Sequence, residues 1–457
     1  MRITLPKHVA ACLNRLSGAG HSAYVVGGCV RDSLLGVAPA DWDICTSALP
    51  GEVLTCFTGC KVIPTGLAHG TVTVLMNGRP AEITTFRSDG DYLDHRRPSS
   101  VDFSVSLRED MARRDFTVNA MAYSPAEGLV DLFGGAGDLA QRRLRCVGDP
   151  AARFCEDALR ILRLFRFSAQ LNFSIEPATL AGAADCRGYL DHIAGERVCK
   201  ELSGLLVSPR PGSALAAMCA CGVLQQIIPE FAPCVGFDQN TPYHNRTVDA
   251  HTFAAVDAAP PQLPVRLALL LHDIGKPICC QERGGVSHFP GHDAEGARIA
   301  RGVLRRLRFD SATASRAVKL IALHDQDIPP DPAALRRLLS RLGEQALRQM
   351  LEVNTADNRA KNPGPAAERL SALLRAREML ETLCAEGPPV RLGDLAVDGE
   401  DLLRLGYPQD ARLGEALQIL LEEVLQDPAR NERTWLLERA VGMLTATGAP
   451  PPTGAGR

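Results

Sequence analysis

Hydrophobic and polar positions follow two different periods along this chain, and the change between them divides the sequence. Within residues 1–140, short runs rich in β-branched residues are bounded by Gly, Pro or Asp, which predicts strands at 23–28, 41–46, 71–76 and 81–86. The stretches at 8–16 and 30–35 repeat apolar residues at helical spacing. This alternation predicts a small α/β domain.

Beyond residue 140 the pattern becomes helical. The stretch DALRILRLFRFSAQL (157–171) repeats apolar residues at three- and four-residue steps. We predict an all-helical neck, a histidine-bearing helical body, a helical tail and a disordered end, over 141–235, 236–345, 346–446 and 447–457. No run of about 18 apolar residues occurs, so we expect no membrane span.

Charge and cysteine usage narrow the function classes. The formal net charge is −3, so an RNA site would have to be a local basic patch. Residues 141–170 carry seven arginines and three acidic residues, which supplies such a patch. The 15 cysteines form no CxxC pair, and the N-terminal stretch lacks the apolar core of a signal peptide. We expect a cytoplasmic protein with reduced thiols.

Two aspartates near the start of a predicted strand are the first candidate for chemistry. Asp41 and Asp43 stand two residues apart, which points both side chains to one face of a strand. Two carboxylates on one face repel each other unless a cation lies between them, and hard oxygen ligands favour Mg²⁺. An isolated D-x-D sequence is more often a solvated turn.

Neighbouring residues strengthen the magnesium interpretation. Gly27 and Gly28 precede a predicted helix, where backbone N–H groups can approach a phosphate, although most such pairs are simple turns. Glu82 lies on a later predicted strand and would add a third carboxylate if the strands are neighbours; otherwise it is a surface residue. Two metal ions about 4 Å apart could then promote an in-line displacement at phosphorus.

A second candidate lies in the basic segment. On a continuous helix, Asp157 and Arg160 would share a face. The alternative is an exposed ion pair worth about 0.3–0.5 kcal/mol. Cytosine and adenine each present an amino donor beside a ring-nitrogen acceptor, which suits a carboxylate beside an arginine. Uracil and guanine present the reverse order and would leave groups unpaired, at a cost of about 1–3 kcal/mol each.

Histidines and aspartates form a third pattern. His251 is followed by His272–Asp273, then by His288 and His292, then by His324–Asp325. This order resembles the ligand pattern of HD-domain metal-dependent phosphohydrolases, and the resemblance implies a divalent metal of unknown identity on His251, His272, Asp273 and Asp325. Some HD domains keep the fold as a scaffold only.

Four motifs occur together in the first half of the chain: GGCVRD (27–32), DWDICT (41–46), EDMARRDFTVNAM (109–121) and FCEDALRILRLFRF (154–167). As a set they resemble class II tRNA nucleotidyltransferases and the related bacterial poly(A) polymerases. The resemblance implies a polymerase β-like palm in the head, with Mg²⁺ on Asp41 and Asp43, and a base-reading role for Asp157 and Arg160. It also implies phosphate or sugar contacts by other residues: Gly28, Arg31, Arg114, Arg163 and Arg166.

The family resemblance implies that tRNA is extended with CCA from CTP and ATP. Poly(A) polymerases share the chemistry but often end in a basic tail, whereas this sequence ends in PPPTGAGR. A partial enzyme that adds only CC or only A is disfavoured because the segment 88–110, which matches the loop governing the switch from C to A, has full length. An HD phosphohydrolase with an inactive head is disfavoured by the intact Asp41–Asp43 pair. No pattern bears on oligomeric state.

Overall fold

The computed structural model describes residues 2–67, 70–89, 101–103 and 106–446. Much of the segment 88–110 and the predicted disordered end at 447–457 lie outside the described residues. The chain separates into two compact units, one formed by Met1–Val235 with Val303–Phe309 and the other by Gly236–Gly302 with Asp310–Arg457.

A seven-stranded sheet forms the head of the first unit. Its strand order is β3-β4-β5-β2-β1-β8-β9, and each neighbouring pair is antiparallel except β2 and β5. The four predicted strands are present. The strands are β1 (Ala23–Val26), β2 (Asp43–Thr46), β3 (Lys61–Gly66), β4 (Thr71–Met76), β5 (Arg79–Thr85), β8 (Met121–Ser124) and β9 (Gly128–Asp131).

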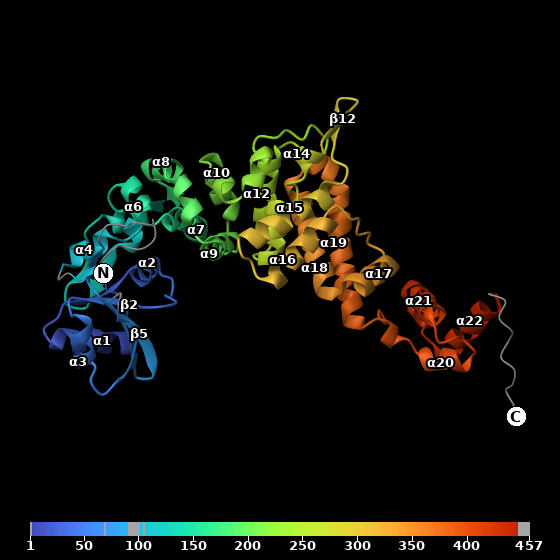
Figure 1. The fold of residues 1–457 in the computed structure, drawn as a ribbon, viewed down its shortest axis with the longest axis horizontal. Coiled ribbons are helices and arrows are strands. Elements are labelled where there is room, and N and C mark those ends of the chain that lie inside the picture. The colour runs from blue at the N-terminus through green and yellow to red at the C-terminus, as the bar shows by residue number, and fades with distance from the viewer. Residues whose placement is uncertain (1, 68–69, 90–100, 104–105, 447–457) are drawn as a thin grey trace. The chain divides into compact units, whose positions relative to one another are not determined.

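Helices of the head complete the α/β layer (Figure 1). Helix α1 (Lys7–Gly18) buries Val9, Cys12, Leu13 and Leu16, whose three- and four-residue spacing forms one apolar stripe against the sheet. Helix α2 (Gly28–Leu34) begins directly after β1 and packs against β1 and β8. The start of α2 therefore lies at the end of a central strand. Helices α3 (Pro50–Cys56), α4 (Leu107–Ala112) and α5 (Gly135–Ala140) also belong to the head.

The neck was predicted as all-helical, and it is helical apart from two short paired strands, β10 (Arg143–Leu144) and β11 (Ser174–Ile175). Its first helical stretch is broken. Helix α6 (Pro150–Glu156) ends before Asp157, and α7 (Leu159–Leu171) begins after it. Helix α7 buries both apolar and arginine side chains and packs against α9 (Gly195–Leu206) and α10 (Pro211–Ala220). Helices α8 (Pro177–Asp185) and α11 (Val223–Ile227) complete the neck.

The second unit is a helical bundle followed by a smaller helical group (Figure 1). Helix α18 packs against α12, α13 and α16, which brings the histidine-bearing segments together. The bundle comprises α12 (Val248–Ala258), α13 (Leu263–Leu271), α14 (Lys276–Cys279), α15 (His292–Arg306), α16 (Ser311–Leu323), α17 (Pro332–Leu342), α18 (Glu344–Ala360) and α19 (Pro363–Glu386). The last group comprises α20 (Gly399–Arg404), α21 (Ala411–Gln426) and α22 (Arg433–Ala446) around a separate apolar core. In the part of the chain that the structure describes, no helix has the length and apolar character to cross a membrane.

Candidate active site

Three carboxylates gather where β2 runs beside β5. The two strands are parallel, and their register sets Asp43 directly beside Glu82. In-register residues on neighbouring strands lie about 4.8 Å apart and face the same side of the sheet. Loss of solvent and the charge of Asp41 raise the pKa of the Asp43 carboxyl group; Glu82 also raises it, whereas Arg114 lowers it. The predicted proximity of these two strands is therefore present.

No ion pair neutralises Asp41 or Asp43 among the residues that the structure describes. The positive charge that lowers the pKa of Asp43 is that of Arg114, whose guanidinium pairs instead with Asp110 at 3.3 Å. Two adjacent carboxylates without a partner cation form a site that a hard divalent ion would stabilise.

A cavity of about 590 Å³ opens in front of these carboxylates. Eight of the ten residues predicted for catalysis or nucleotide binding line it, and Glu82 and Arg166 do not. The lining consists of Gly27, Gly28, Arg31, Asp41, Asp43, Arg113, Arg114, Asp115, Asn119, Asp157, Leu159, Arg160, Arg163, Phe167 and Arg197. An arginine-rich cavity beside a cluster of carboxylates suits a triphosphate with bound metal.

A hydrogen-bonded chain orients two of the cavity arginines. Arg31 donates from Nη1 to Asn119 Oδ1 at 2.7 Å, and Asn119 donates to Asp115 at 3.1 Å. Asp115 also accepts from Arg163 at 2.6 and 2.9 Å. Burial alone would raise the pKa of Asp115, but Arg163, with the hydrogen bonds from Asn119 and the Phe116 N–H, outweighs it and holds that pKa below its usual value. The guanidinium groups of Arg31 and Arg163 also lie 5.3 and 5.2 Å from the ring centre of Phe167, which further fixes them.

The sequence interpretation missed Asp115, Asn119 and Phe167. Asp115 and Asn119 lie in the motif RRDFTVN, where polar residues alternate with buried apolar ones. A polar side chain in a buried stretch needs a partner, and this was the available signal. The partner of Asp115 is 48 residues away in the chain, so the local pattern alone did not identify it.

Asp157 does not share a helical face with Arg160 as the sequence pattern predicted. It lies in an extended conformation at the break between α6 and α7, where Oδ1 accepts from the backbone N–H of Leu159 at 3.1 Å. Its other carboxylate oxygen accepts from Arg197 at 3.1 Å. Asp157 and Arg160 nevertheless line the same cavity. The predicted helical conformation of Asp157 is wrong, but both side chains can still contact one base.

Hydrogen bonds to the protein fix the position of the Arg160 side chain. It donates to Glu156 at 2.6 Å and to the backbone carbonyls of Arg153 and Arg113 at 3.0 and 2.8 Å. A guanidinium has five N–H groups, so donors remain for a ligand after these contacts. The side chain is thus fixed at the cavity rather than free on a helix surface.

Arg166 does not line the cavity, although its guanidinium packs 4.3 Å from the ring centre of Phe167, which does. Its guanidinium donates to Glu201 on α9 and to Gln170. Glu201 is buried, so this ion pair joins α7 to α9 and supports the neck. The predicted phosphate contact of Arg166 therefore has no support from this geometry, and we leave it out of the site.

Gly27 adopts a backbone conformation with positive φ, which is strained for any residue that has a side chain. Its φ is +79°, and a Cβ there would lie 2.9 Å from Nη1 of Arg114. We expect Gly27→Ala to lower the free energy of unfolding by about 1–3 kcal/mol. Gly28→Ala is the matched control for stability, because a Cβ there meets only Arg31 Nη2 at 3.6 Å. Equal urea denaturation midpoints for the two variants would contradict this account.

The histidine pattern forms a second, buried site in the bundle. His251 Nε2 lies 3.0 Å from Asp357 Oδ1, and His272 Nε2 lies 3.2 Å from Asp273 Oδ2. Burial would lower the pKa of His272, but the carboxylates of Asp273 and Asp357 together outweigh it and raise that pKa to about 9. Three of the four predicted ligands therefore lie together with Asp357, which the sequence interpretation missed.

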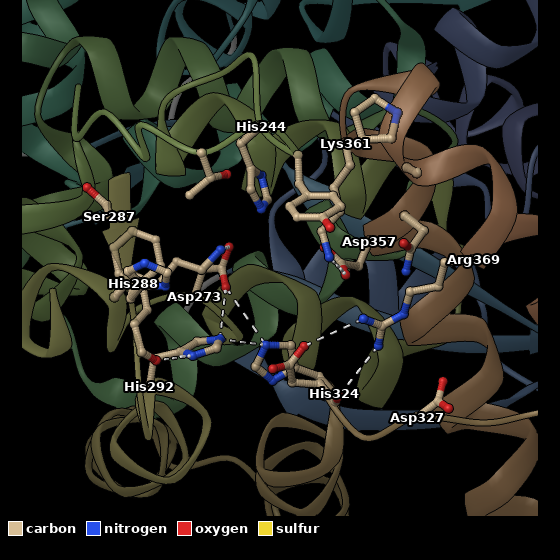
Figure 2. A pocket seen from close by; sticks show the side chains of 18 of the residues that line it. His244, Asp273, Ser287, His288, His292, His324, Asp327, Asp357, Lys361 and Arg369 are labelled. Atoms are coloured by element: carbon tan, nitrogen blue, oxygen red, sulfur yellow. Dashed lines mark hydrogen bonds and ion pairs between the residues drawn. The ribbon is translucent and has the colours of Figure 1, made fainter. Parts of the chain in front are cut away.

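Asp325, predicted as the fourth ligand, does not lie in the buried cluster. Its side chain is 58% exposed and lies 3.9 Å from Arg369, whereas His324 beside it turns inward (Figure 2). Asp357 replaces it and lies on α18, beyond the predicted end of the body at residue 345. The available signal was a group of four polar residues within one helical turn and a half, Asn354, Thr355, Asp357 and Asn358, which would be costly to bury without a function.

Family models match three parts of the chain. Residues 23–145 match the poly A polymerase head domain, residues 172–235 match a probable RNA- and SrmB-binding site of polymerase A, and residues 255–359 match the HD domain. The HD match includes His272, Asp273 and Asp357 of the observed cluster and begins four residues after His251.

Relatives of similar length are known. The chain is 33% identical over 95% of its length, and 96% of the relative, to a CCA-adding enzyme of Limosilactobacillus fermentum. It is 34% identical over 93% of its length, and 95% of the relative, to that of Geobacillus stearothermophilus. A Bacillus stearothermophilus CCA-adding enzyme in complex with CTP is similar in structure, with a TM-score of 0.71 and 29% identity over 98% of this chain and 100% of that one.

The sheet, the paired carboxylates and the arginine-lined cavity define a nucleotidyltransferase head, and the chain joins it to an HD domain. More narrowly, the chain belongs to the family of CCA-adding enzymes, which are tRNA nucleotidyltransferases.

Proposed function

We propose that the head adds C, C and A to the 3′ end of tRNA, from CTP and ATP and without a nucleic-acid template. The observation that carries the proposal is the uncompensated pair Asp41–Asp43 at the edge of an arginine-lined cavity. A solved CCA-adding enzyme complexed with CTP, which resembles this chain over its whole length, supports the choice of substrate. The proposed site of action is the cytoplasm.

Asp41 and Asp43, with Glu82 beside them, would hold two Mg²⁺ ions. When bound, these ions lower the pKa of the attacking 3′-hydroxyl and neutralise charge on the departing pyrophosphate. Arg31, Arg114 and Arg163 would bind the triphosphate oxygens. The RNA 3′ oxygen forms a bond to the α-phosphorus as the bond from that phosphorus to the bridging oxygen of pyrophosphate breaks.

Asp157 and Arg160 would choose the base. The Asp157 carboxylate accepts from the amino group of cytosine or adenine, and Arg160 donates to the adjacent ring nitrogen. Arg197 and the Leu159 N–H hold Asp157, and Glu156 holds Arg160, so the pair is set before the nucleotide binds. Uracil and guanine would face acceptor to acceptor and donor to donor, which a buried contact penalises.

Three tRNA substrates that end at successive stages of CCA addition distinguish this proposal from a poly(A) polymerase and from a partial enzyme. The chain is incubated with tRNA lacking CCA, tRNA ending in C, and tRNA ending in CC, each with one nucleoside triphosphate at a time, and the products are sequenced. We expect CTP to extend the first two acceptors and ATP to extend only the third, by one residue. Repeated addition from ATP on all three would indicate a poly(A) polymerase, and failure of either CTP or ATP would indicate a partial enzyme.

We also propose that His251, His272, Asp273 and Asp357 hold a divalent metal ion. All four side chains are buried, and the ligand atoms of His251, His272 and Asp357 lie within 4.8 Å of one another, which suits an ion between them. A cavity of about 930 Å³ with Lys276 and Lys361 in its lining lies beside them, which favours a phosphate-bearing ligand. This site belongs to the second unit and would work separately from the head.

Because the head cavity and the histidine cluster share no residue, loss of the cluster should leave nucleotide addition intact. We expect His272→Ala combined with Asp273→Ala to change kcat/KM for CTP addition by no more than about twofold, because no residue of the head cavity belongs to that cluster. The measurement is the initial rate of CTP incorporation, with thermal unfolding as a check that the variant remains folded. A folded variant that has lost nucleotide addition would show that the sites are coupled.

A further inference from the structure

The aromatic ring of Phe167 lies among three arginines. Its centre is 5.3 Å from the guanidinium carbon of Arg31, 5.2 Å from that of Arg163 and 4.3 Å from that of Arg166. A guanidinium within about 6 Å of a ring centre is attracted by the negative charge of the ring face. Arg31 and Arg163 line the head cavity, as Phe167 itself does. The ring therefore contacts two of the side chains to which we assign the triphosphate.

Helical spacing brings Phe167 to the wall of the cavity. Arg160, Arg163 and Phe167 are three and four residues apart on α7, so they share one face of that helix. Phe165 on the same helix is fully buried and does not belong to the cavity lining. Phe167 thus has charged neighbours and a ligand-facing position that an ordinary core phenylalanine lacks.

Contacts behind the cavity wall fix the Phe167 ring. Phe116 is fully buried and meets it edge to face, with the ring centres 6.0 Å apart and the ring planes at 85°. Arg166 packs on the ring and pairs with Glu201 on α9. Gly204 of α9 leaves the space for Arg166, because a Cβ there would lie 2.7 Å from Arg166 Cδ. The ring is therefore in place before a nucleotide binds.

The two cavity arginines are also held by hydrogen bonds along the edges of their guanidinium groups. Arg31 donates to Asn119 and to Asp32, and Arg163 donates twice to Asp115. Such bonds fix the edge of a planar group, and an aromatic neighbour restricts its remaining tilt. The ring and the hydrogen bonds together set the direction in which the free N–H groups point.

We propose that Phe167 is a positioning residue for the triphosphate, whose ring holds Arg31 and Arg163 in the orientation that meets the phosphate oxygens. This inference rests on the proposed function, because it takes a nucleoside triphosphate as the ligand of the cavity. Guanidinium groups that are already oriented lose less freedom on binding, so the ring raises the affinity for every nucleoside triphosphate alike. Asp157 and Arg160 are held by other partners, so base choice does not depend on the ring.

Phe167→Leu tests the loss of the ring. We expect the dissociation constants of CTP and ATP, taken from single-turnover rates over a range of concentrations, to rise about tenfold, which corresponds to about 1.4 kcal/mol. The maximal rate and the CTP/UTP ratio of kcat/KM should each change by less than about twofold, because the ring acts on binding that is common to the ground state and the transition state. Thermal unfolding shows whether the variant remains folded.

Ring fluorination separates electrostatic attraction from packing and preserves the core. Site-specific replacement of Phe167 by analogues that carry one, two or three ring fluorines keeps nearly the same shape but weakens the negative face in steps. We expect the logarithm of the CTP dissociation constant to rise with each fluorine, to about fivefold in total. The same replacements at Phe165 are the matched control and should leave this constant unchanged.

The outcomes distinguish this inference from the proposed function. An unchanged CTP dissociation constant across the fluorinated Phe167 variants, in a chain whose wild type adds nucleotides, would overturn the inference, because the ring would then act by packing alone. Fluorination that alters the CTP/UTP ratio in place of the affinity would also overturn it, since the ring would then act on the base. A wild-type chain that binds neither CTP nor ATP would instead overturn the proposed function of the head.

Discussion

Asp41→Ala or Asp43→Ala is expected to lower kcat/KM for both C and A addition by about 10³-fold or more, which corresponds to about 4 kcal/mol of transition-state stabilisation. The two carboxylates share one edge of the cavity, and Asp43 has its pKa raised by lost solvent and by the charge of Asp41. Removing either leaves only one aspartate of the pair, with Glu82 beside it, to hold the ions for every addition. C and A addition should therefore fall together.

The measurement is single-turnover incorporation of CTP on tRNA lacking CCA and of ATP on tRNA ending in CC. Glu52→Ala is the control, because Glu52 is an acidic residue on helix α3 of the same domain and only caps that helix. Near-normal rates in either aspartate variant, or loss of only one of the two additions, would contradict a shared metal site.

Asp157→Ala is expected to reduce the preference for CTP over UTP, expressed as a ratio of kcat/KM values, by about ten- to a hundredfold. The physical reason is the loss of an acceptor that pairs with the cytosine amino group and repels the uracil carbonyl, worth about 1–3 kcal/mol. Affinity for the triphosphate should change less, because Arg31 and Arg163 are held by the separate network through Asp115 and Asn119.

Two further variants sharpen this result. Asp157→Asn keeps the shape but can turn an amide donor toward uracil, so it should also lose discrimination. Arg166→Ala is the matched control on the same neck, because Arg166 pairs with Glu201 outside the cavity and should leave the CTP/UTP ratio unchanged. An unchanged ratio in folded Asp157→Ala would mean that the residue only supports the start of α7.

Local patterns in the sequence predicted the head well. The two-residue spacing of Asp41 and Asp43 depends only on the alternation of side chains in a strand, and β-branched runs marked β1, β2, β4 and β5. Glu82 lies beside Asp43 only because β2 and β5 pair in parallel. From the sequence, a role for Glu82 depended on these two strands being neighbours. The structure shows that the two strands are neighbours.

Contacts between residues far apart in the chain could not be predicted from the local sequence pattern. The apolar period continues through Asp157, yet the helix breaks there because the Asp157 side chain caps Leu159 and pairs with Arg197, 40 residues away. In the HD cluster, 106 residues separate His251 from Asp357. The third His-Asp pair in the sequence, at His324 and Asp325, suggested a nearer ligand, but only its histidine faces the cluster.

Competition among nucleotides tests the central claim most directly. The wild-type chain is given tRNA lacking CCA with equal concentrations of CTP, ATP, UTP and GTP, and the 3′ ends are sequenced after many turnovers. The account predicts that nearly all extended ends read CCA and stop there. Ends that carry U or G in proportion to supply, or runs of A on tRNA that lacks CC, would contradict it.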